Sequence, residues 1–386
     1  SHRINKAVAN GAKVFVINPV DYSFTFHVAG KVITADVIST LSEVIDALNN
    51  GSSSEVAKQM ADALKSAEKA AVFLGAFSLN HPHAAYIRAQ VRKLAELTGT
   101  SIGVLTEGAN ASGAYLAGAV PHRGPAGAET KGPRGLSAKE LFIDKPVRAY
   151  FFLGFEPEFD TVFPAAAMQS LRAADLAVCL TSYVTDTMKT YADVILPIAP
   201  FTENEGTFVN VEGTWQSFDA AGPLKGKAKP AWQVIRAIAR AMQMSGFDYE
   251  FVTDIRDEVK AKVEAMSPYQ PKPVSLGEKP ALKKGLLRMG AYPPSCVDGV
   301  VRRAKALQET NHQGTASIGL NEKEAKALGF NLGDRVTAIQ GGTRVTLPVL
   351  IDNRLADGIV SIPMGLPETA GFGEVMAFVE FDREGL

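Results

Sequence analysis

The sequence predicts an α/β protein with two open parallel-sheet (Rossmann-like) domains followed by a C-terminal β-barrel. Three observations support this fold class. Amphipathic helices alternate with short apolar strands, a Pro- and Lys-rich stretch (SPYQPKPVSLGEKP) then interrupts the pattern, and the last part contains alternating strands joined by tight turns. We therefore expect α/β domains at 1–145 and 146–245, a linker with helices at 246–305 and a barrel at 306–386.

The first domain begins with the second half of a βαβ crossover. RINKAVAN has helical composition, Gly11 suits a helix stop, and KVFVINP predicts a buried strand that ends at Pro19. A parallel sheet requires a strand before that helix, so we expect this chain to be part of a longer protein. Further helices are predicted at 35–48 and 55–68 and in HPHAAYIRAQVRKLAELTG, with strands in AAVFLG and SIGVLT.

The second domain follows a Gly-, Pro- and Ala-rich connection at 106–146, a length that usually indicates a functional or mobile loop. Strands are predicted in VRAYFFLG, DLAVCLT and ADVILP, and helices at 163–173 and in PAWQVIRAIARAM. In the barrel, NEKEAKALGF predicts a helix with a capping box of Asn321 and Glu324. RVTAIQGGTRVTLPV predicts a hairpin with a two-residue Gly-Gly turn.

Composition excludes several function classes. Lys plus Arg number 40 against 41 Asp plus Glu, so the chain has no general attraction to nucleic acid or to an anionic membrane. No apolar run approaches the roughly 20 residues that cross a bilayer. Two cysteines cannot supply the about four ligands of an iron–sulfur cluster. We expect a cytoplasmic protein in which Cys179 is buried and Cys296 is a loop residue.

Three short segments could carry chemistry. GFEPEFD follows a strand, where Gly154 and Glu156 could contact a nucleotide, although a plain strand-to-helix turn is favoured because no GxGxxG accompanies it. TENEGTFVNVEGTW holds closely spaced acids, but its alternation predicts a hairpin rather than a cation site. His81 and His83 form an H-x-H pair that we expect to be solvent-exposed, because a metal site would need further ligands.

Several elements resemble the molybdopterin oxidoreductase superfamily. YVTDTMKTYADVILPIAPFTENEGTFVNVEG is similar to its T-x-T-x-x-x-ADVVLP and E-x-x-GT-(F/Y)-x-N-x-EGR segments, and FFLGFEP to its (V/L)-x-G-E-N-P turn. RINKAVANGAKVFVINP and SIGLNEKEAKALGFNLGDRV resemble its first crossover and its barrel. The resemblance implies a vestigial cofactor pocket without catalytic or metal-binding residues, whose candidates are Gly154, Glu156, Thr187, Asp193, Glu205, Gly206 and Asn210.

Within the superfamily the chain most resembles the molybdopterin-type portion of bacterial NADH:quinone oxidoreductase (respiratory complex I). The segments that carry this likeness are GVLTEGANASGAYLAGAVPHR and CVDGVVRRAKALQET. The resemblance implies a structural domain that contacts other subunits of the peripheral arm, on the cytoplasmic side of the inner membrane, with no nucleic acid and no membrane insertion. It also implies that the iron–sulfur clusters lie outside this chain, in an N-terminal part.

The departures from the superfamily pattern predict that no molybdopterin binds. Val20 and Thr214 stand where active members carry Arg, and Phe155 and Glu156 replace the Glu-Asn of the G-E-N-P turn. Each missing arginine removes charge-assisted contacts to a dianionic dinucleotide. Two alternatives stay open: part of an active formate dehydrogenase or nitrate reductase type enzyme, and a nucleotide-binding module without catalysis, which GTP or GDP would stabilise.

Overall fold

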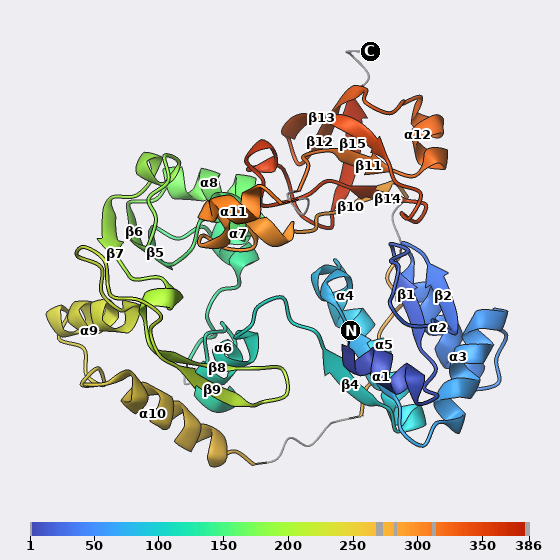
Figure 1. Cartoon of the computed structure of the whole chain (residues 1–386), viewed down its shortest axis with the longest axis horizontal. Coiled ribbons are helices and arrows are strands. Elements are labelled where there is room, and N and C mark those ends of the chain that lie inside the picture. Colours follow the sequence, from blue (N-terminus) through green and yellow to red (C-terminus); the bar gives the residue numbers. More distant parts are fainter. Residues whose placement is uncertain (1, 131, 268–272, 282–283, 311–313, 383–386) are drawn as a thin grey trace.

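The computed structural model describes residues 2–130, 132–267, 273–281, 284–310 and 314–382. Figure 1 shows three units: a first α/β unit (blue), a second α/β unit (green) and a barrel (orange to red). The fold class predicted from the sequence is confirmed, because parallel sheets precede a closed barrel. Within the described ranges, no helix is both long and apolar enough to cross a membrane.

The first α/β unit contains two separate two-stranded parallel sheets, β1–β2 and β3–β4, rather than one continuous sheet. Helices α2 and α5 pack together, and α2 buries the apolar face that its spacing predicts. The elements are α1 (His2–Ala9), β1 (Phe15–Asn18), β2 (Gly30–Ile33), α2 (Val37–Leu48), α3 (Glu55–Ser66), β3 (Ala71–Leu74), α4 (Ala76–Asn80), α5 (Ala84–Thr98) and β4 (Ser101–Val104).

The long Gly-rich connection contains short helices and is tied to the second unit. These helices are α6 (Ala111–Ala117), η1 (Pro125–Gly127) and the π-helical turn η2 (Glu140–Asp144). The Oδ1 atom of Asn110 accepts a hydrogen bond of 2.8 Å from the backbone N–H of Val209, which lies 99 positions later in the chain. This bond fixes the start of α6 against strand β8.

The second α/β unit is built on a three-stranded parallel sheet in the order β5–β6–β7, with the β8–β9 hairpin after it. Helix α8 packs Ala167, Met168 and Leu171 against Tyr150 and Cys179 of the sheet. The elements are β5 (Ala149–Leu153), α7 (Pro157–Asp160), α8 (Pro164–Arg172), β6 (Leu176–Thr181), η3 (Met188–Thr190), β7 (Val194–Pro197), η4 (Phe201–Glu203), β8 (Gly206–Val209), β9 (Trp215–Phe218) and α9 (Ala231–Ala241).

The barrel closes in the order β10–β14–β11–β13–β12–β15. Its first strand lies inside the range 246–305 that the sequence assigned to the linker. Leu286, Leu287 and Arg288 of β10 are all buried, so this strand lacks the alternation that would have revealed it. The remaining elements are α10 (Val252–Glu264), β10 (Leu286–Met289), η5 (Pro294–Cys296), η6 (Val301–Arg303), α11 (Lys305–Gln308), β11 (Ile318–Leu320), α12 (Glu322–Leu328), β12 (Arg335–Gln340), β13 (Thr343–Ile351), β14 (Ile359–Ser361), η7 (Pro367–Thr369) and β15 (Phe378–Asp382).

Local turn chemistry predicted the barrel well. Strands β12 and β13 pair through Gly341 and Gly342, whose φ angles of 55° and 82° suit the turn of a tight hairpin. Asn321 caps α12 by accepting a hydrogen bond from the Glu324 N–H at 2.8 Å. The Glu324 carboxylate accepts from the Gly358 N–H instead of completing the predicted capping box.

The barrel is joined to the first α/β unit at the carboxyl end of β1. Val20 forms an antiparallel bridge with Leu355, and the Ala356 N–H donates to the Pro19 carbonyl at 2.8 Å. Val20 is 3 % exposed and packs in an apolar cluster with Leu287 and Ile359 of the barrel. Val20, where the resemblance implies an arginine in active members, is therefore part of an apolar contact.

Candidate functional site

The turn after β5 is shaped by Gly154. Its φ of 59° lies in the left-handed region that favours glycine, and its N–H donates to the Leu180 carbonyl of β6 at 2.8 Å. The chain then enters α7, and the backbone N–H of Glu156 donates to the Asp160 carboxylate at 2.7 Å. Glu156, a candidate residue of the vestigial pocket, is only 3 % exposed.

Glu156 is paired with two arginines from the segment before the barrel. Its Oε1 atom lies 2.9 Å from Nη2 of Arg303, and its Oε2 atom lies 3.2 Å from Nη2 of Arg302. The same Nη2 atom of Arg302 lies 2.7 Å from Oδ1 of Asp160. We call these four residues, Glu156, Asp160, Arg302 and Arg303, the Glu156 cluster. Its ion pairs lie at the carboxyl end of β5, and all of their charges come from this chain.

Each arginine of the Glu156 cluster is held by further contacts. Arg302 donates to the Cys296 carbonyl at 3.0 Å and lies over the Phe159 ring, 5.0 Å from its centroid. Arg303 donates to the Gly299 carbonyl at 2.8 Å and lies over the Tyr183 ring at 4.5 Å. Planar guanidinium groups combine such stacking with paired hydrogen bonds, which a lysine could not do.

The Glu156 cluster is not fully satisfied. Among the residues that the structure describes, Oε2 of Glu156 and Nε of Arg302 are buried without a hydrogen-bond partner. The 3.2 Å contact between Glu156 and Arg302 is therefore an ion pair whose geometry does not meet that of a hydrogen bond. A buried donor without an acceptor costs free energy, which offsets part of what the ion pairs contribute to stability.

A small cavity lies beside the Glu156 cluster, between α7 and the barrel, with Glu158 and Arg288 among its lining residues. Burial raises the pKa of Glu158, and the negative charges of Glu156 and Asp160 add to this effect. Arg288 is 1 % exposed and donates to the carbonyls of Ile362 and Phe372. The cavity is thus lined by the acidic Glu158, and the guanidinium of Arg288 is already bound to backbone carbonyls.

Asp193 and Thr187, the other predicted pocket residues of the β5–β7 region, make hydrogen bonds with nearby backbone groups. Asp193 lies at the amino end of β7, opposite to Gly154, where its carboxylate accepts from the Ala177 N–H at 2.7 Å. Thr187 precedes η3 and is half-buried, with its carbonyl accepting from the Thr190 hydroxyl. Both residues have local roles in strand pairing and in a turn.

The predicted residues of the β8–β9 hairpin are structural as well. Asn210 accepts from the N–H groups of Glu212 and Thr214, which shapes the turn of the hairpin. At Gly206 a Cβ atom would lie 2.8 Å from the Phe218 ring, so a larger residue there would displace that ring. Glu205 is exposed. Figure 1 shows this hairpin next to α6 and apart from α7.

The prediction that His81 is exposed was wrong. His81 is 6 % exposed, its Nδ1 atom accepts from the His83 N–H, and its ring lies 5.6 Å from that of Phe77. Burial, together with His83, lowers the pKa of His81 to about 4. Cys179 is buried as predicted, and Cys296 is buried as well, at the end of the short helical turn η5. Within the described part of the chain, no group of three or more His, Cys, Asp or Glu side chains could hold a metal.

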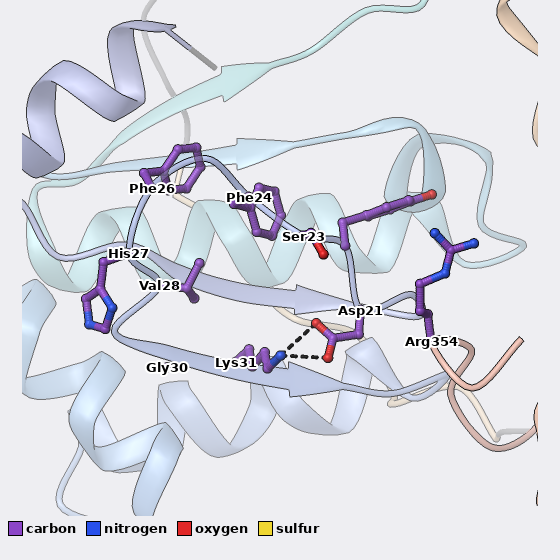
Figure 2. A pocket seen from close by; sticks show the side chains of 10 residues that line it. Asp21, Ser23, Phe24, Phe26, His27, Val28, Gly30, Lys31 and Arg354 are labelled. Carbon is purple, nitrogen blue, oxygen red and sulfur yellow. Dashed lines mark hydrogen bonds and ion pairs between the residues drawn. The ribbon is translucent and has the colours of Figure 1, made fainter. Parts of the chain in front are cut away.

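An open pocket of about 560 Å³ lies at the carboxyl end of β1 (Figure 2). The loop between β1 and β2 contributes Phe24 and Phe26, whose rings stack at 5.2 Å. Its two cations are both paired with carboxylates: Lys31 with Asp21 at 2.6 Å, and Arg354 with Asp352 at 2.7 Å. Sequence reasoning did not single out this pocket, because its residues carry no motif.

Sequence reasoning also missed the two arginines of the Glu156 cluster. Arg302 and Arg303 are adjacent in CVDGVVRRAKALQET, which gives a visible signal of positive charge in a supposed linker. Asp160, which pairs with Arg302, lies 142 positions earlier in the chain, and Glu156 lies shortly before Asp160. The pairing becomes visible only when the linker folds back on α7.

Parts of this chain are similar in sequence to known proteins. An assimilatory nitrate reductase catalytic subunit of Bacillus subtilis (strain 168) is 32% identical over 131 residues, which are 33% of this chain and 18% of that protein. A Staphylococcus aureus (strain USA300) protein with a provisional formate dehydrogenase name is 41% identical over 100 residues, 25% of this chain and 9% of that protein. The matches thus span less than a fifth of either relative's length.

Among solved structures, acetylene hydratase of Pelobacter acetylenicus matches with a TM-score of 0.43 and 17% identity, over 61% of this chain and 41% of that one. The relatives named here are a nitrate reductase and a formate dehydrogenase, not a component of complex I. The family model described as molybdopterin oxidoreductase matches residues 2–241, which is more than half of the chain. This chain therefore belongs to the molybdopterin oxidoreductase family.

Proposed function

We propose that this chain is a structural domain of a larger oxidoreductase and that it binds no molybdopterin. The observation that carries the proposal is the Glu156 cluster. In open α/β sheets, ligands bind outside the carboxyl ends of the strands. Here the carboxyl end of β5 is closed by ion pairs between Glu156 and two arginines of the same chain.

The residues at this strand end do not fit the cofactor that the family usually binds. A pterin dinucleotide carries a negatively charged pyrophosphate, which needs cations or free backbone N–H groups. Arg302 and Arg303 are already paired, and Glu156, Glu158 and Asp160 place three acids within five positions. An additional anion would meet like charges in a buried setting, which is unfavourable.

The departures from the superfamily pattern have structural roles that agree with this proposal. Val20 joins the first α/β unit to the barrel, and Phe155 packs against Phe152 at 5.3 Å. Thr214 belongs to the hairpin turn that Asn210 shapes. At each position the family's polar residue is replaced by one that serves packing or a turn.

The larger oxidoreductase that we propose is complex I, with this chain as its molybdopterin-type domain. The sequence resemblance of the Gly-rich connection and of the segment around Arg302 supports this assignment. In it, electrons from NADH reach quinone through iron–sulfur clusters outside this chain, and other subunits of the peripheral arm contact it on the cytoplasmic side of the inner membrane.

An assembly experiment tests the structural role. We expect that deleting residues 146–382 from the chromosomal gene abolishes stable NADH:quinone oxidoreductase in membranes, measured as NADH oxidation and by native gels. Cells that cannot synthesise molybdopterin should retain full NADH oxidation. If the pterin-deficient cells lost this activity, or if the deletion left it intact, the proposal would be contradicted.

The second candidate is part of an active molybdopterin oxidoreductase of nitrate reductase or formate dehydrogenase type. The names of the relatives support this candidate better than they support complex I. It predicts that the intact protein reduces a dye with formate, or oxidises a reduced dye with nitrate, and that molybdenum-free growth abolishes this activity. Absence of both reactions in a fully folded preparation would exclude it.

A further inference from the structure

The joint between the first α/β unit and the barrel includes an aromatic side chain of the short helix α4, Phe77. This side chain packs against an apolar cluster, the joint cluster, whose buried members are Val20, Leu287, Leu355, Ala356, Ile359 and Met376. We propose that His81, at the end of α4, is a pH-sensitive switch at this joint, and that its protonation weakens the packing of Phe77 against the barrel. The switch does not depend on whether the chain binds a cofactor.

Phe77 belongs to two apolar clusters at once. On one side it packs against the joint cluster, and on the other it packs against buried residues of α2, β3 and α5, among them Ile38, Leu74 and Ile87. The His81 ring lies 5.6 Å from the Phe77 ring, with the two planes at 60°. Because close-packed interiors transmit displacements, a movement of His81 reaches the barrel through Phe77.

The hydrogen bonding of His81 requires a neutral imidazole. Its Nδ1 atom accepts from the backbone N–H of His83 at 3.0 Å, and a ring nitrogen can accept only while it carries no proton. Protonation places a hydrogen on Nδ1, so this bond is lost and two donors face each other. The His83 carbonyl in turn accepts from the Ile87 N–H at 3.1 Å, so the change acts on the corner where α4 meets α5.

The charges around His81 favour opening of this corner in acid. Burial is the main reason why the pKa of His81 falls to about 4, and His83 lowers it further. Asp36 acts in the opposite direction, but its carboxylate already caps α2. Glu107, the acid next to the end of α4, is bound to the Asn80 amide. An opened corner returns His81 to water and to its ordinary pKa of 6.5, so protons favour the opened state as the pH falls from 6.5 towards 4.

Hydrogen–deuterium exchange of the whole chain, corrected for the effect of pH on the intrinsic rates, tests the switch. Between about pH 7.5 and about pH 5, uptake of one proton on opening should lower the protection of the corner (76–84) and of the barrel segment 352–358 by about 20-fold. The N–H of Ala356, which donates to the Pro19 carbonyl, reports on the barrel side. The β12–β13 hairpin, whose core residues belong to a separate cluster, reports on unfolding of the whole barrel.

Three variants show whether His81 and Phe77 carry the response. His81→Gln offers an amide oxygen to the His83 N–H but takes up no proton, so we expect both segments to lose their pH dependence. His27→Gln, at an exposed histidine, is the matched control and should keep it. Phe77→Leu should keep the response at the corner and lose it in the barrel segment, because the ring that connects them is gone.

The outcomes decide for or against the switch. Segments that exchange faster than the hairpin, with a pH response that His81→Gln removes, would support it. Equal protection of the hairpin and both segments at either pH would mean that the joint opens only when the whole barrel unfolds, and would overturn it. A folded His81→Gln variant with the parent's response would also overturn it. If His81→Gln does not fold, Phe77→Leu decides, since a barrel segment that still responds like the parent would contradict transmission through Phe77.

Discussion

The carboxyl ends of β1 and β5 occupy corresponding places in two parallel sheets, but only the first is open. At β1 the pocket is about 560 Å³, and its Lys31–Asp21 pair has side chains that are 52% and 38% exposed. At β5 the side chains of Glu156 and Arg302 are 4% and 8% exposed. The difference arises because the segment before the barrel supplies two arginines to β5, whereas the barrel contributes mainly apolar residues at β1.

This comparison shows how burial changes the importance of an ion pair. An exposed pair contributes at most about 1 kcal/mol, because water already solvates both charges. Removing one partner of a buried pair leaves a charge without compensation and costs about 3–5 kcal/mol. Similar acid–base pairs at two strand ends should therefore differ severalfold in their effect on the free energy of unfolding.

The largest expected effect tests the apolar joint beside the open pocket. Val20→Arg places an unpaired charge and a larger side chain in the cluster of Leu287 and Ile359, and should lower the free energy of unfolding by about 4 kcal/mol. Urea denaturation followed by circular dichroism measures it. Val20→Ile, which keeps the site apolar, should cost less than about 1.5 kcal/mol. Equal stability of both variants would show that an arginine is tolerated there.

The next effect concerns the closed strand end. Glu156→Ala should lower the free energy of unfolding by about 3 kcal/mol, because Arg303 loses its carboxylate partner while Arg302 keeps Asp160. The same urea titration applies to this variant. A loss below about 1 kcal/mol would mean that the Glu156 cluster behaves like an exposed pair, and the contrast between the two strand ends would fail.

A smaller effect is expected from pH. Burial holds the pKa of His81 at about 4 in the folded chain, against 6.5 for an exposed histidine. The unfolded chain therefore binds more protons between these values, and stability that is complete above pH 6.5 is lost as the pH falls towards 4. We expect His81 to account for about 1–2 kcal/mol of this loss. His81→Phe should reduce the pH dependence, with the exposed His27→Gln as control; an unchanged profile in His81→Phe would contradict the assignment.

The smallest effect completes the comparison at β1. Asp21→Ala removes the partner of Lys31 in the open pocket, and should change the free energy of unfolding by less than about 1 kcal/mol. High salt should diminish this difference further. A cost similar to that of Glu156→Ala would show that the β1 pocket is closed in solution.

Local signals predicted much of this fold, and non-local contacts account for what was missed. The Gly341–Gly342 hairpin and the α2 face depend on neighbouring residues, so the sequence revealed them. The β10 strand shows no alternation, because its residues meet the barrel core and Arg288 meets backbone carbonyls.

The candidate site was predicted less well than the fold. Gly154 and Glu156 were located at the correct strand end, but the partners of Glu156 come from a segment that sequence reasoning treated as linker. Asp193 and Asn210 carry the family motif, yet their side chains bond to backbone groups nearby. A motif position shows which family a chain belongs to more reliably than it shows which residues meet a ligand.

The molybdenum and pterin content of the intact protein, purified from cells supplied with molybdate, tests the central claim most directly. Mass spectrometry of the metal and fluorescence of the oxidised pterin give two independent readings on one preparation. The closed strand end at β5 predicts less than about a tenth of an equivalent of either. Molybdenum and pterin near one equivalent each would mean that the Glu156 cluster does not prevent cofactor binding, and the structural role proposed for this chain would be contradicted.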